Sequence, residues 1–360
     1  STAAATAGAV TSEAGQSPAR SRRNTIIQAV IGIGLIILLF GVILPAFIDY
    51  ELVFDAMRSL EIWQLGVLLV LALLRIIAES SLYSAAIPGL GFGPGLKSFL
   101  ASNTVADLAP PPADLAVRFG MYKSLGISTE RAGAGIIISG VFSIGARLVL
   151  PVIALVIVLV SGVDDETTWV LAALGVSALV GAGALITMMI RSEQWTARVG
   201  EWVGRAAERV AARFGRKIDA ADLGTKAAEF RGRLVGVVRD RWAHASAAVI
   251  ASHLVSYAVL LAALRFVGVS NAQIDWVDLL VAYAIVRLIT LIPLTPGGIG
   301  VAAAGYVVLL SANDDSLANL IGAASFLTRI FVWLVPLLIG IFPLITWRRT
   351  QTTKDTESDS

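Results

Sequence analysis

Five arginines lie inside otherwise apolar stretches of the chain: Arg75, Arg147, Arg265, Arg287 and Arg329. An arginine at the centre of a bilayer costs about 2.5–3.5 kcal/mol, so each needs a carboxylate, an anion or water beside it. Arg265 is close to the end of its stretch and can reach the membrane surface, which leaves four. A planar guanidinium bonds phosphate oxygens in pairs, so the four predict a phosphate-bearing ligand.

Three acidic residues could neutralise part of this charge. Glu79 follows Arg75 by four residues, one helical turn, so the two are expected to pair. Asp107 and Asp114 flank a proline run and are candidate partners for the other arginines. The alternative interpretation is a set of structural ion pairs. Arg118, just past the run, could collect anionic headgroups or serve only to orient the chain in the membrane.

Composition indicates that the bilayer holds most of the chain. Of 360 residues, 56% are hydrophobic and 15% charged, with a mean hydropathy of +0.79. Soluble domains have about 45–50% apolar and about 25% charged residues. There is no cysteine, and two histidines cannot alone form a zinc site. We expect no metal, no cofactor and no nucleic-acid partner, and the chain contains no ATP-binding G-x-x-x-x-G-K-[ST] loop.

Six stretches are long and apolar enough to cross a bilayer as helices. They are Thr25–Ile48, Trp63–Ile87, Gly133–Val160, Thr168–Ile190, Ala243–Gly268 and Asn319–Trp347. With both termini in the cytoplasm, the inner segments hold 22 Lys and Arg residues and the outer segments hold one. This asymmetry predicts that orientation, and the short loops fit a bacterial plasma membrane. Residues 1–24 are expected to be disordered, and 348–360 to form a cytoplasmic tail.

Two further apolar segments are broken by proline and glycine. Ser98–Val117 contains Pro110, Pro111 and Pro112, and Val277–Leu310 contains the motif Pro293-Leu294-Thr295-Pro296-Gly297-Gly298-Ile299-Gly300. Proline breaks a helix, and each half is too short to cross. Broken backbone at membrane depth must be buried in protein or line a wet cavity. We interpret both as re-entrant helical hairpins that gate access; kinked ordinary spans are the alternative.

The spacing of these features repeats along the chain. Pro111 precedes Arg147 by 36 residues, and Pro293 precedes Arg329 by 36 residues. Repeat one covers 63–160 and repeat two covers 243–347, with hairpins that enter from opposite faces. We therefore expect an all-α polytopic fold: about six spanning helices and two re-entrant hairpins in an inverted repeat, which is typical of alternating-access transporters. A chance coincidence of spacing is the alternative.

Residues 191–242 separate the two repeats and are rich in basic residues. Their apolar residues recur at helical spacing, which predicts two amphipathic helices on the inner membrane surface. A helical connector packed on the bundle is the alternative.

The second broken segment carries a family resemblance. Pro293–Val301 is similar to the Pro-x-Thr-Pro-Gly-Gly-Ile-Gly motif of the flippase-like membrane domain of the lysylphosphatidylglycerol synthetase family. Leu108–Gly126, with Pro112, Asp114 and Arg118, resembles an earlier motif, although Asp stands where Glu is usual and three prolines replace a Gly-rich turn. The resemblance covers residues 25–347. It implies a lipid flippase fold with two re-entrant hairpins.

Lipid aminoacylation is not expected, because synthetase members carry a large soluble transferase domain, whereas this chain ends 13 residues after its last span.

The favoured function is transport of an anionic phospholipid, glycolipid or polyprenyl-phosphate-linked lipid. Arg147 and Arg329 would bind the phosphate, with Arg287 as a further candidate, and Arg75 with Glu79 would orient it. Glu79, Asp107 or Asp114 could couple transport to an ion. The alternatives are a membrane glycosyl- or phosphotransferase that uses acids of the first outer loop, and a non-transporting scaffold. A homo-oligomer is compatible with the sequence.

Overall fold

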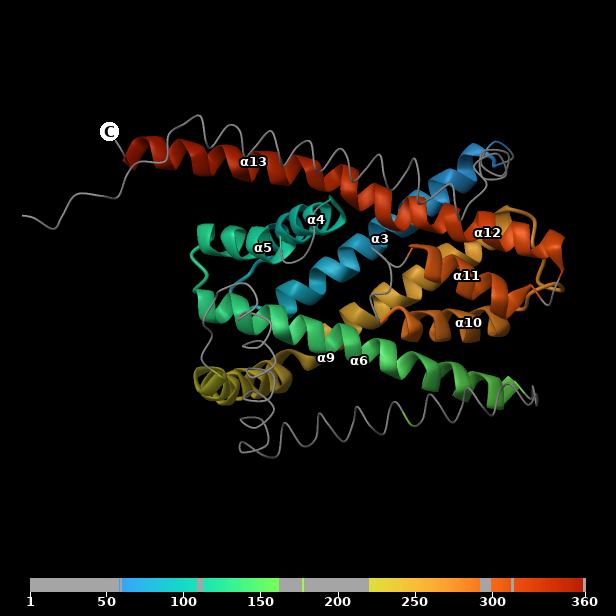
Figure 1. Cartoon of the computed structure of the whole chain (residues 1–360), viewed down its shortest axis with the longest axis horizontal. Helices are drawn as coiled ribbons and strands as arrows, with labels where there is room; N and C mark the ends of the chain where they lie inside the picture. Colours follow the sequence, from blue (N-terminus) through green and yellow to red (C-terminus); the bar gives the residue numbers. More distant parts are fainter. Residues whose placement is uncertain are drawn as a thin grey trace, which may run out of the picture. The chain divides into compact units, whose positions relative to one another are not determined.

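The computed structural model describes residues 60–108, 113–161, 220–291, 299–311 and 314–358, together with the isolated residues 58 and 177. Every regular element within these ranges is a helix (Figure 1). This confirms the predicted all-α class.

Four helical stretches among these residues are long and apolar enough to cross a bilayer. They are α3 (Ile62–Ala86), α6 (Thr129–Ser161), the part of α9 (Ala220–Phe266) that begins at Arg241, and Asp315–Trp347. The last is built from α12 (Asp315–Arg329), the π-helical turn η3 (Ile330–Leu334) and the first half of α13 (Val335–Ser358). They coincide with four of the six expected spans. Thr25–Ile48 and residues 1–24 lie outside the described residues, and of Thr168–Ile190 only residue 177 is described.

The two proline-broken segments each fold as a pair of short helices. α4 (Phe92–Leu108) packs against α5 (Ala113–Ser124), and α10 (Trp276–Ile289) packs against α11 (Ile299–Leu310). Helices of 12 to 17 residues extend about 18–26 Å, less than the roughly 30 Å of a hydrocarbon core. The expected interruptions are therefore present, and the membrane face from which each hairpin enters stays a prediction.

The hairpins pack reciprocally on the two halves of the chain. α4 lies along α13, and α10 lies along α6, so each hairpin contacts the last span of the other half (Figure 1). The central contact is between α3 and α9, the first described span of each half. A two-fold relation between the halves would produce this pattern, because equivalent helices would then make equivalent contacts.

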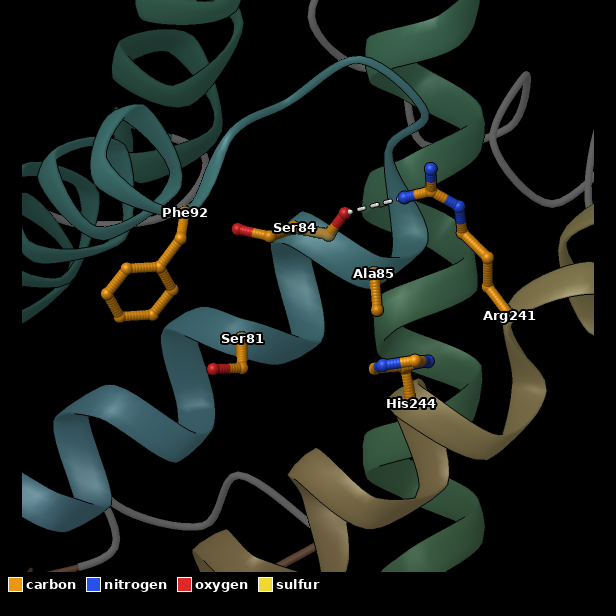
Figure 2. Close-up of a pocket in the computed structure, with 6 residues that line it drawn as sticks. All are labelled: Ser81, Ser84, Ala85, Phe92, Arg241 and His244. Carbon is orange, nitrogen blue, oxygen red and sulfur yellow. Dashed lines mark hydrogen bonds between the residues drawn. The ribbon is translucent and has the colours of Figure 1, made fainter.

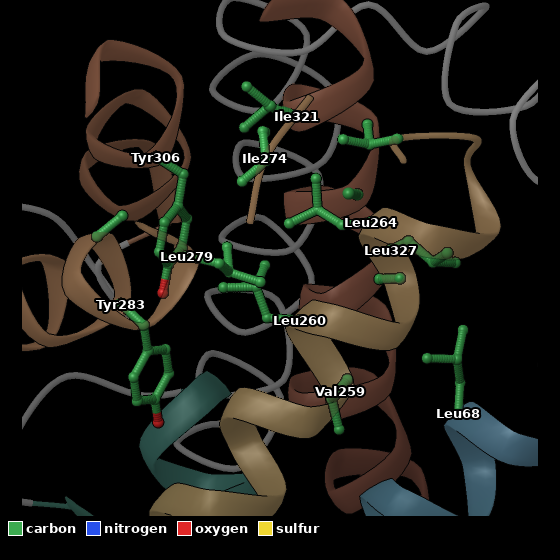
Figure 3. Close-up of a cluster of buried hydrophobic side chains, with 14 of the residues drawn as sticks. Leu68, Val259, Leu260, Leu264, Ile274, Leu279, Tyr283, Tyr306, Ile321 and Leu327 are labelled. Atoms are coloured by element: carbon green, nitrogen blue, oxygen red, sulfur yellow. The ribbon is translucent and has the colours of Figure 1, made fainter. Parts of the chain in front are cut away.

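The largest buried cluster joins spans from both halves (Figure 3). Leu68 comes from α3, Leu260 and Leu264 from α9, Tyr283 from α10 and Ile321 from α12; all are almost fully buried. Lipid tails are as apolar as leucine, so close packing rather than hydrophobic transfer holds such helices together. This cluster fixes the relative positions of the helices that carry the arginines.

The C-terminus of α9 and the N-terminus of α12 each have a clear local cause. Gly268 ends α9 with φ of 97°, a conformation that glycine adopts easily, and its N–H bonds the carbonyl of Arg265. Arg265 in turn donates to the carbonyls of Val269 and Ile274, which fits its expected position outside the membrane centre. At α12, Asp314 accepts hydrogen bonds from Ser316 and the Leu317 N–H, and these bonds lower the pKa of its carboxyl.

The connector between the halves differs from the expectation. A separate second surface helix was predicted within 191–242, but residues 220–240 are continuous with the following span in α9. No proline occurs between Ala220 and Phe266, so nothing removes a backbone donor and the helix continues. α13 likewise continues past Trp347 to Ser358, so the predicted tail is largely helical.

Candidate functional site: an intramembrane arginine cluster

α3 supplies the first cation of the site and its counter-ion. Arg75 Nη2 lies 2.6 Å from Glu79 Oε2, with the two side chains 16% and 29% exposed. Residues four apart share a helix face, and the expected pair is present. The other terminal nitrogen, Nη1, donates to the carbonyl oxygen of Val332 at 3.1 Å. Arg75 therefore bonds both its own helix and a segment of the second half.

Val332 lies in η3, the π-helical turn that follows Arg329 directly. A π turn moves carbonyls away from the usual partner four residues on, and such turns recur at functional sites. Here Arg75 provides a donor to one of these carbonyls. The last span of the second half is thus locally widened at the point where it meets α3.

Three more arginines reach the same region from three other helices. Arg147 comes from α6, Arg287 from α10, and Arg329 ends α12. Arg147 is close enough to interact electrostatically with Arg287, Arg75 and Glu79. Arg329 interacts with Arg287 and Arg75. All of these side chains are half-buried, so the fold gathers the four predicted cations into one site.

Aromatic residues and a histidine support Arg287. Its guanidinium lies 4.9 Å from the centre of the Tyr283 ring, a cation–π contact that is worth about 2 kcal/mol when desolvated. The Tyr283 hydroxyl donates to the carbonyl of His253 at 3.2 Å and lies 3.3 Å from its Nδ1. Tyr306 is also buried within electrostatic range of Arg287.

Asp107 is the second acid of the site. Its Oδ2 accepts a hydrogen bond from Asn103 Nδ2 at 3.1 Å, and the carboxylate also hydrogen-bonds Trp333. Arg329, Arg75 and Glu79 are within electrostatic range of this carboxylate. The role of Asp107 as a partner for the arginines stays a prediction.

Positive charge exceeds negative charge in this arginine cluster, which we define as Arg75, Arg147, Arg287 and Arg329. Four guanidinium groups of the described helices face two described carboxylates, those of Glu79 and Asp107, a formal surplus of two positive charges within this part of the chain. Among the described residues, the buried Nε atoms of Arg75, Arg147 and Arg287 have no hydrogen-bond partner. Surplus charge and open donors in a buried site favour an anion with several oxygens.

A metal site has no comparable support in the described part of the chain. No three His, Asp or Glu side chains there are grouped so that they could hold a metal ion.

Comparison with known families agrees with this architecture. The family model for the lysylphosphatidylglycerol synthase TM region matches residues 27–340. The chain belongs to this family. The chain is therefore an integral membrane protein, as its apolar helices also indicate. Its family relates it to the chemistry of membrane lipids. A search of curated proteins found no match.

Arg118 and Asp114 form a group apart from the arginine cluster. Arg118 is buried, donates Nε and Nη2 to Ser102 Oγ at 3.1 and 2.8 Å, and stacks 4.4 Å from the centre of the Tyr83 ring. Asp114, one turn earlier on α5, is within electrostatic range. The sequence made Arg118 a candidate headgroup ligand and Asp114 a candidate partner for the arginines, and both roles stay predictions. In the structure Arg118 joins α5 to α4 and α3.

Replacing Arg118 with lysine should therefore destabilise the first hairpin. Lysine cannot donate two bonds in a fixed fork or stack its charge flat on Tyr83. We expect the free energy of unfolding to fall by about 1–3 kcal/mol, measured by thermal unfolding in detergent. Arg131→Lys is the matched control because Arg131 is exposed. Equal melting temperatures for the two variants would contradict this role.

The predicted gating residues fall mostly outside the described ranges. These are Pro111, Pro112, Pro293, Pro296, Gly297 and Gly298. Gly300 is the second residue of α11. Their role in gating stays a prediction.

Several residues of the site were not found by sequence reasoning. Tyr283 precedes Arg287 by four residues, so the helical spacing could have indicated the stacking. His253 is a polar residue in a membrane span, which is itself a functional signal. No pattern indicated Val332, because a π-helical turn has no distinctive sequence.

Proposed function

We propose that this protein moves an anionic, phosphate-bearing lipid across the bilayer by alternating access. The phosphate binds the arginine cluster on its way. The surplus of two positive charges there carries the proposal, because the carboxylates of the described residues do not balance the site. Candidate substrates are phospholipids, glycolipids with a phosphate and polyprenyl-phosphate-linked lipids.

The origin of the site from both halves supports an alternating mechanism. Arg75 and Arg147 belong to the first half, and Arg287 and Arg329 belong to the second. A movement of one half against the other would change the spacing of the cations. Two halves related by inversion can exchange roles, so that states open to either side have similar energies.

The hairpins are well placed to couple access to binding. α4 carries Asp107 near its C-terminal end, and α10 carries Arg287 near its own. Each hairpin thus contributes one charged side chain to the site. A hairpin that moves to admit a lipid would also change the local charge balance, so access and phosphate binding would be linked.

We further propose that the chain is a transporter rather than an enzyme, that it needs no cofactor and binds no nucleic acid, and that it lies in a bacterial plasma membrane with both termini in the cytoplasm. The last point rests on the uneven distribution of Lys and Arg between the loops.

The direct test is lipid movement in liposomes that contain the purified full chain. Fluorescent phosphatidylglycerol, phosphatidylcholine and a neutral diacylglycerol would be reconstituted separately, and dithionite quenching would report the fraction that reaches the outer leaflet. We expect the protein to speed phosphatidylglycerol movement over that in protein-free liposomes, and to leave unchanged the movement of diacylglycerol, which has no charged headgroup and crosses bilayers spontaneously. Protein-dependent acceleration of diacylglycerol equal to that of phosphatidylglycerol would contradict phosphate recognition by the arginines.

A further inference from the structure

A pocket separate from the arginine cluster opens where the apolar part of α9 begins. It is a cavity of about 490 Å³ lined by Ser81, Ser84, Ala85, Phe92, Arg241 and His244. Figure 2 shows Ser81 and Ser84 on α3, with Phe92 on one side of that helix and Arg241 and His244 on the other. The cavity is within the usual range for a small ligand or headgroup.

The polar groups of the pocket suit a phosphate headgroup that also contains a hydrogen-bond donor, such as a hydroxyl or an amine. Arg241 and His244 are three residues apart on α9 and so share a helix face. Arg241 Nη1 donates to the Ser84 carbonyl at 3.4 Å (Figure 2), and the guanidinium has further N–H groups. The Ser81 hydroxyl donates to the Ile77 carbonyl at 2.7 Å, which leaves its oxygen lone pairs to accept. An arginine, a histidine and hydroxyl acceptors thus line one cavity.

The position of the pocket is that of a lipid headgroup. Three charged residues, Arg239, Asp240 and Arg241, directly precede the apolar stretch Ala243–Gly268, so we place the pocket where hydrocarbon gives way to headgroups. Trp242 is 57% exposed and Phe92 is 45% exposed, and exposed aromatic rings are typical of that depth. Acyl chains could lie along this surface while the phosphate enters the cavity.

A packed apolar cluster lies beside the pocket and next to Arg147. Leu82 and Ala85 of α3 pack with Ala245 and Val249 of α9, and Ala146 of α6 packs against them. Ala146 immediately precedes Arg147. α3, which lines the pocket, also carries Arg75, and α6, which packs against the same apolar cluster, carries Arg147.

We infer that this pocket binds the phosphate headgroup of a membrane lipid and holds it at one face of the bilayer. Its role as the site from which the lipid passes to the arginine cluster rests on the proposed function, whereas headgroup binding does not. Arg241 and His244 contact the phosphate, and the serine oxygens accept from headgroup hydroxyl or amine groups.

The absence of cysteine from the chain allows a specific test. Ser81→Cys introduces the only thiol, inside the pocket. The full chain would be placed in phosphatidylcholine nanodiscs with and without 30% phosphatidylglycerol, and the alkylation rate with N-ethylmaleimide measured. We expect phosphatidylglycerol to slow alkylation at least about fivefold, as a bound headgroup would cover the thiol. Millimolar inorganic phosphate should not slow it, and Asp315→Cys, on an exposed position of α12, should react equally in both nanodiscs.

Two further variants test the assigned contacts in the Ser81→Cys background. Arg241→Gln with His244→Gln should remove the protection, and Arg241→Lys alone should retain at least half of it, which also shows that the pocket tolerates substitution. Equal alkylation rates with and without phosphatidylglycerol would overturn the inference, as would protection that persists in the double variant. Equal protection by inorganic phosphate would assign a soluble anion in place of a lipid.

Headgroup binding in the pocket and the proposed transport can be tested independently. In the Ser81→Cys background, Arg147→Gln should strongly slow lipid movement but leave the protection intact. A wild-type protein that moves no lipid would overturn transport, yet protection at Ser81→Cys would still establish the pocket. Lost protection with intact lipid movement would overturn the pocket alone.

Discussion

Lipid movement in liposomes is expected to fall by about 10- to 100-fold when Arg147 is replaced with glutamine. A hydrogen bond to a charged group contributes about 1.5–3 kcal/mol, and 1.4 kcal/mol corresponds to a tenfold change in an equilibrium. Arg147 has a buried Nε without a hydrogen-bond partner in the described structure and faces Arg287 and Arg75. Its removal therefore takes away a phosphate donor and half of the surplus charge. The rate of dithionite-sensitive phosphatidylglycerol movement measures the effect.

The matched control for this variant is Arg131→Gln on the same helix. Arg131 is exposed near the start of α6, so its replacement changes the net charge equally without touching the cluster. We expect the control to transport at least half as fast as the wild type. If Arg147→Gln transports as fast as Arg131→Gln, the cluster is a structural ion network, which was the alternative interpretation of the sequence.

The second large effect concerns the contact between α4 and α13. Gly340 lies on α13 so close to α4 that an added Cβ would collide with the carbonyl oxygen of Leu100 and with Thr104 Oγ1. Thr104 Oγ1 also donates to the Leu337 carbonyl across this contact, at 3.1 Å. Close approach at a small residue is a common way to pack membrane helices. A backbone carbonyl cannot move aside as a side-chain end can, so the two helices would have to separate.

Gly340→Ala is therefore expected to destabilise the protein by about 1–3 kcal/mol or more. For a chain of this size, we expect a melting temperature lower by about 5 °C, followed by the fluorescence of its eight tryptophans. Gly322→Ala is the matched control, because its added Cβ meets nothing within 4 Å and alanine favours a helix by about 1 kcal/mol over glycine. A Gly340→Ala protein as stable as Gly322→Ala would show that the helices are not in tight contact there.

Arg118 shows that a buried arginine in this protein can join helices, a role different from the phosphate binding proposed for the arginine cluster. From the sequence, a basic residue just past the proline run is expected to collect anionic headgroups or to orient the chain in the membrane. Its Nε and Nη2 instead bond Ser102, and its plane covers Tyr83. Residue type and depth could not distinguish these roles, because they depend on which side chains other helices bring to the guanidinium.

The periodicity and composition of the chain already specified its class, four spans that the structure shows, two broken segments and the pairing of Arg75 with Glu79. Each of these follows from local chemistry: apolar length, missing proline donors, or a separation of one helical turn. The convergence of Arg75, Arg147, Arg287 and Arg329, by contrast, is a property of the packed helices. It depends on α10 lying along α6 and on the buried cluster that joins α3, α9 and α12. Likewise, the hydrogen bond from Arg75 to Val332 and the pocket at Arg241 exist because segments distant in the sequence meet in the fold. Residue spacing along the chain does not specify which distant segments come into contact.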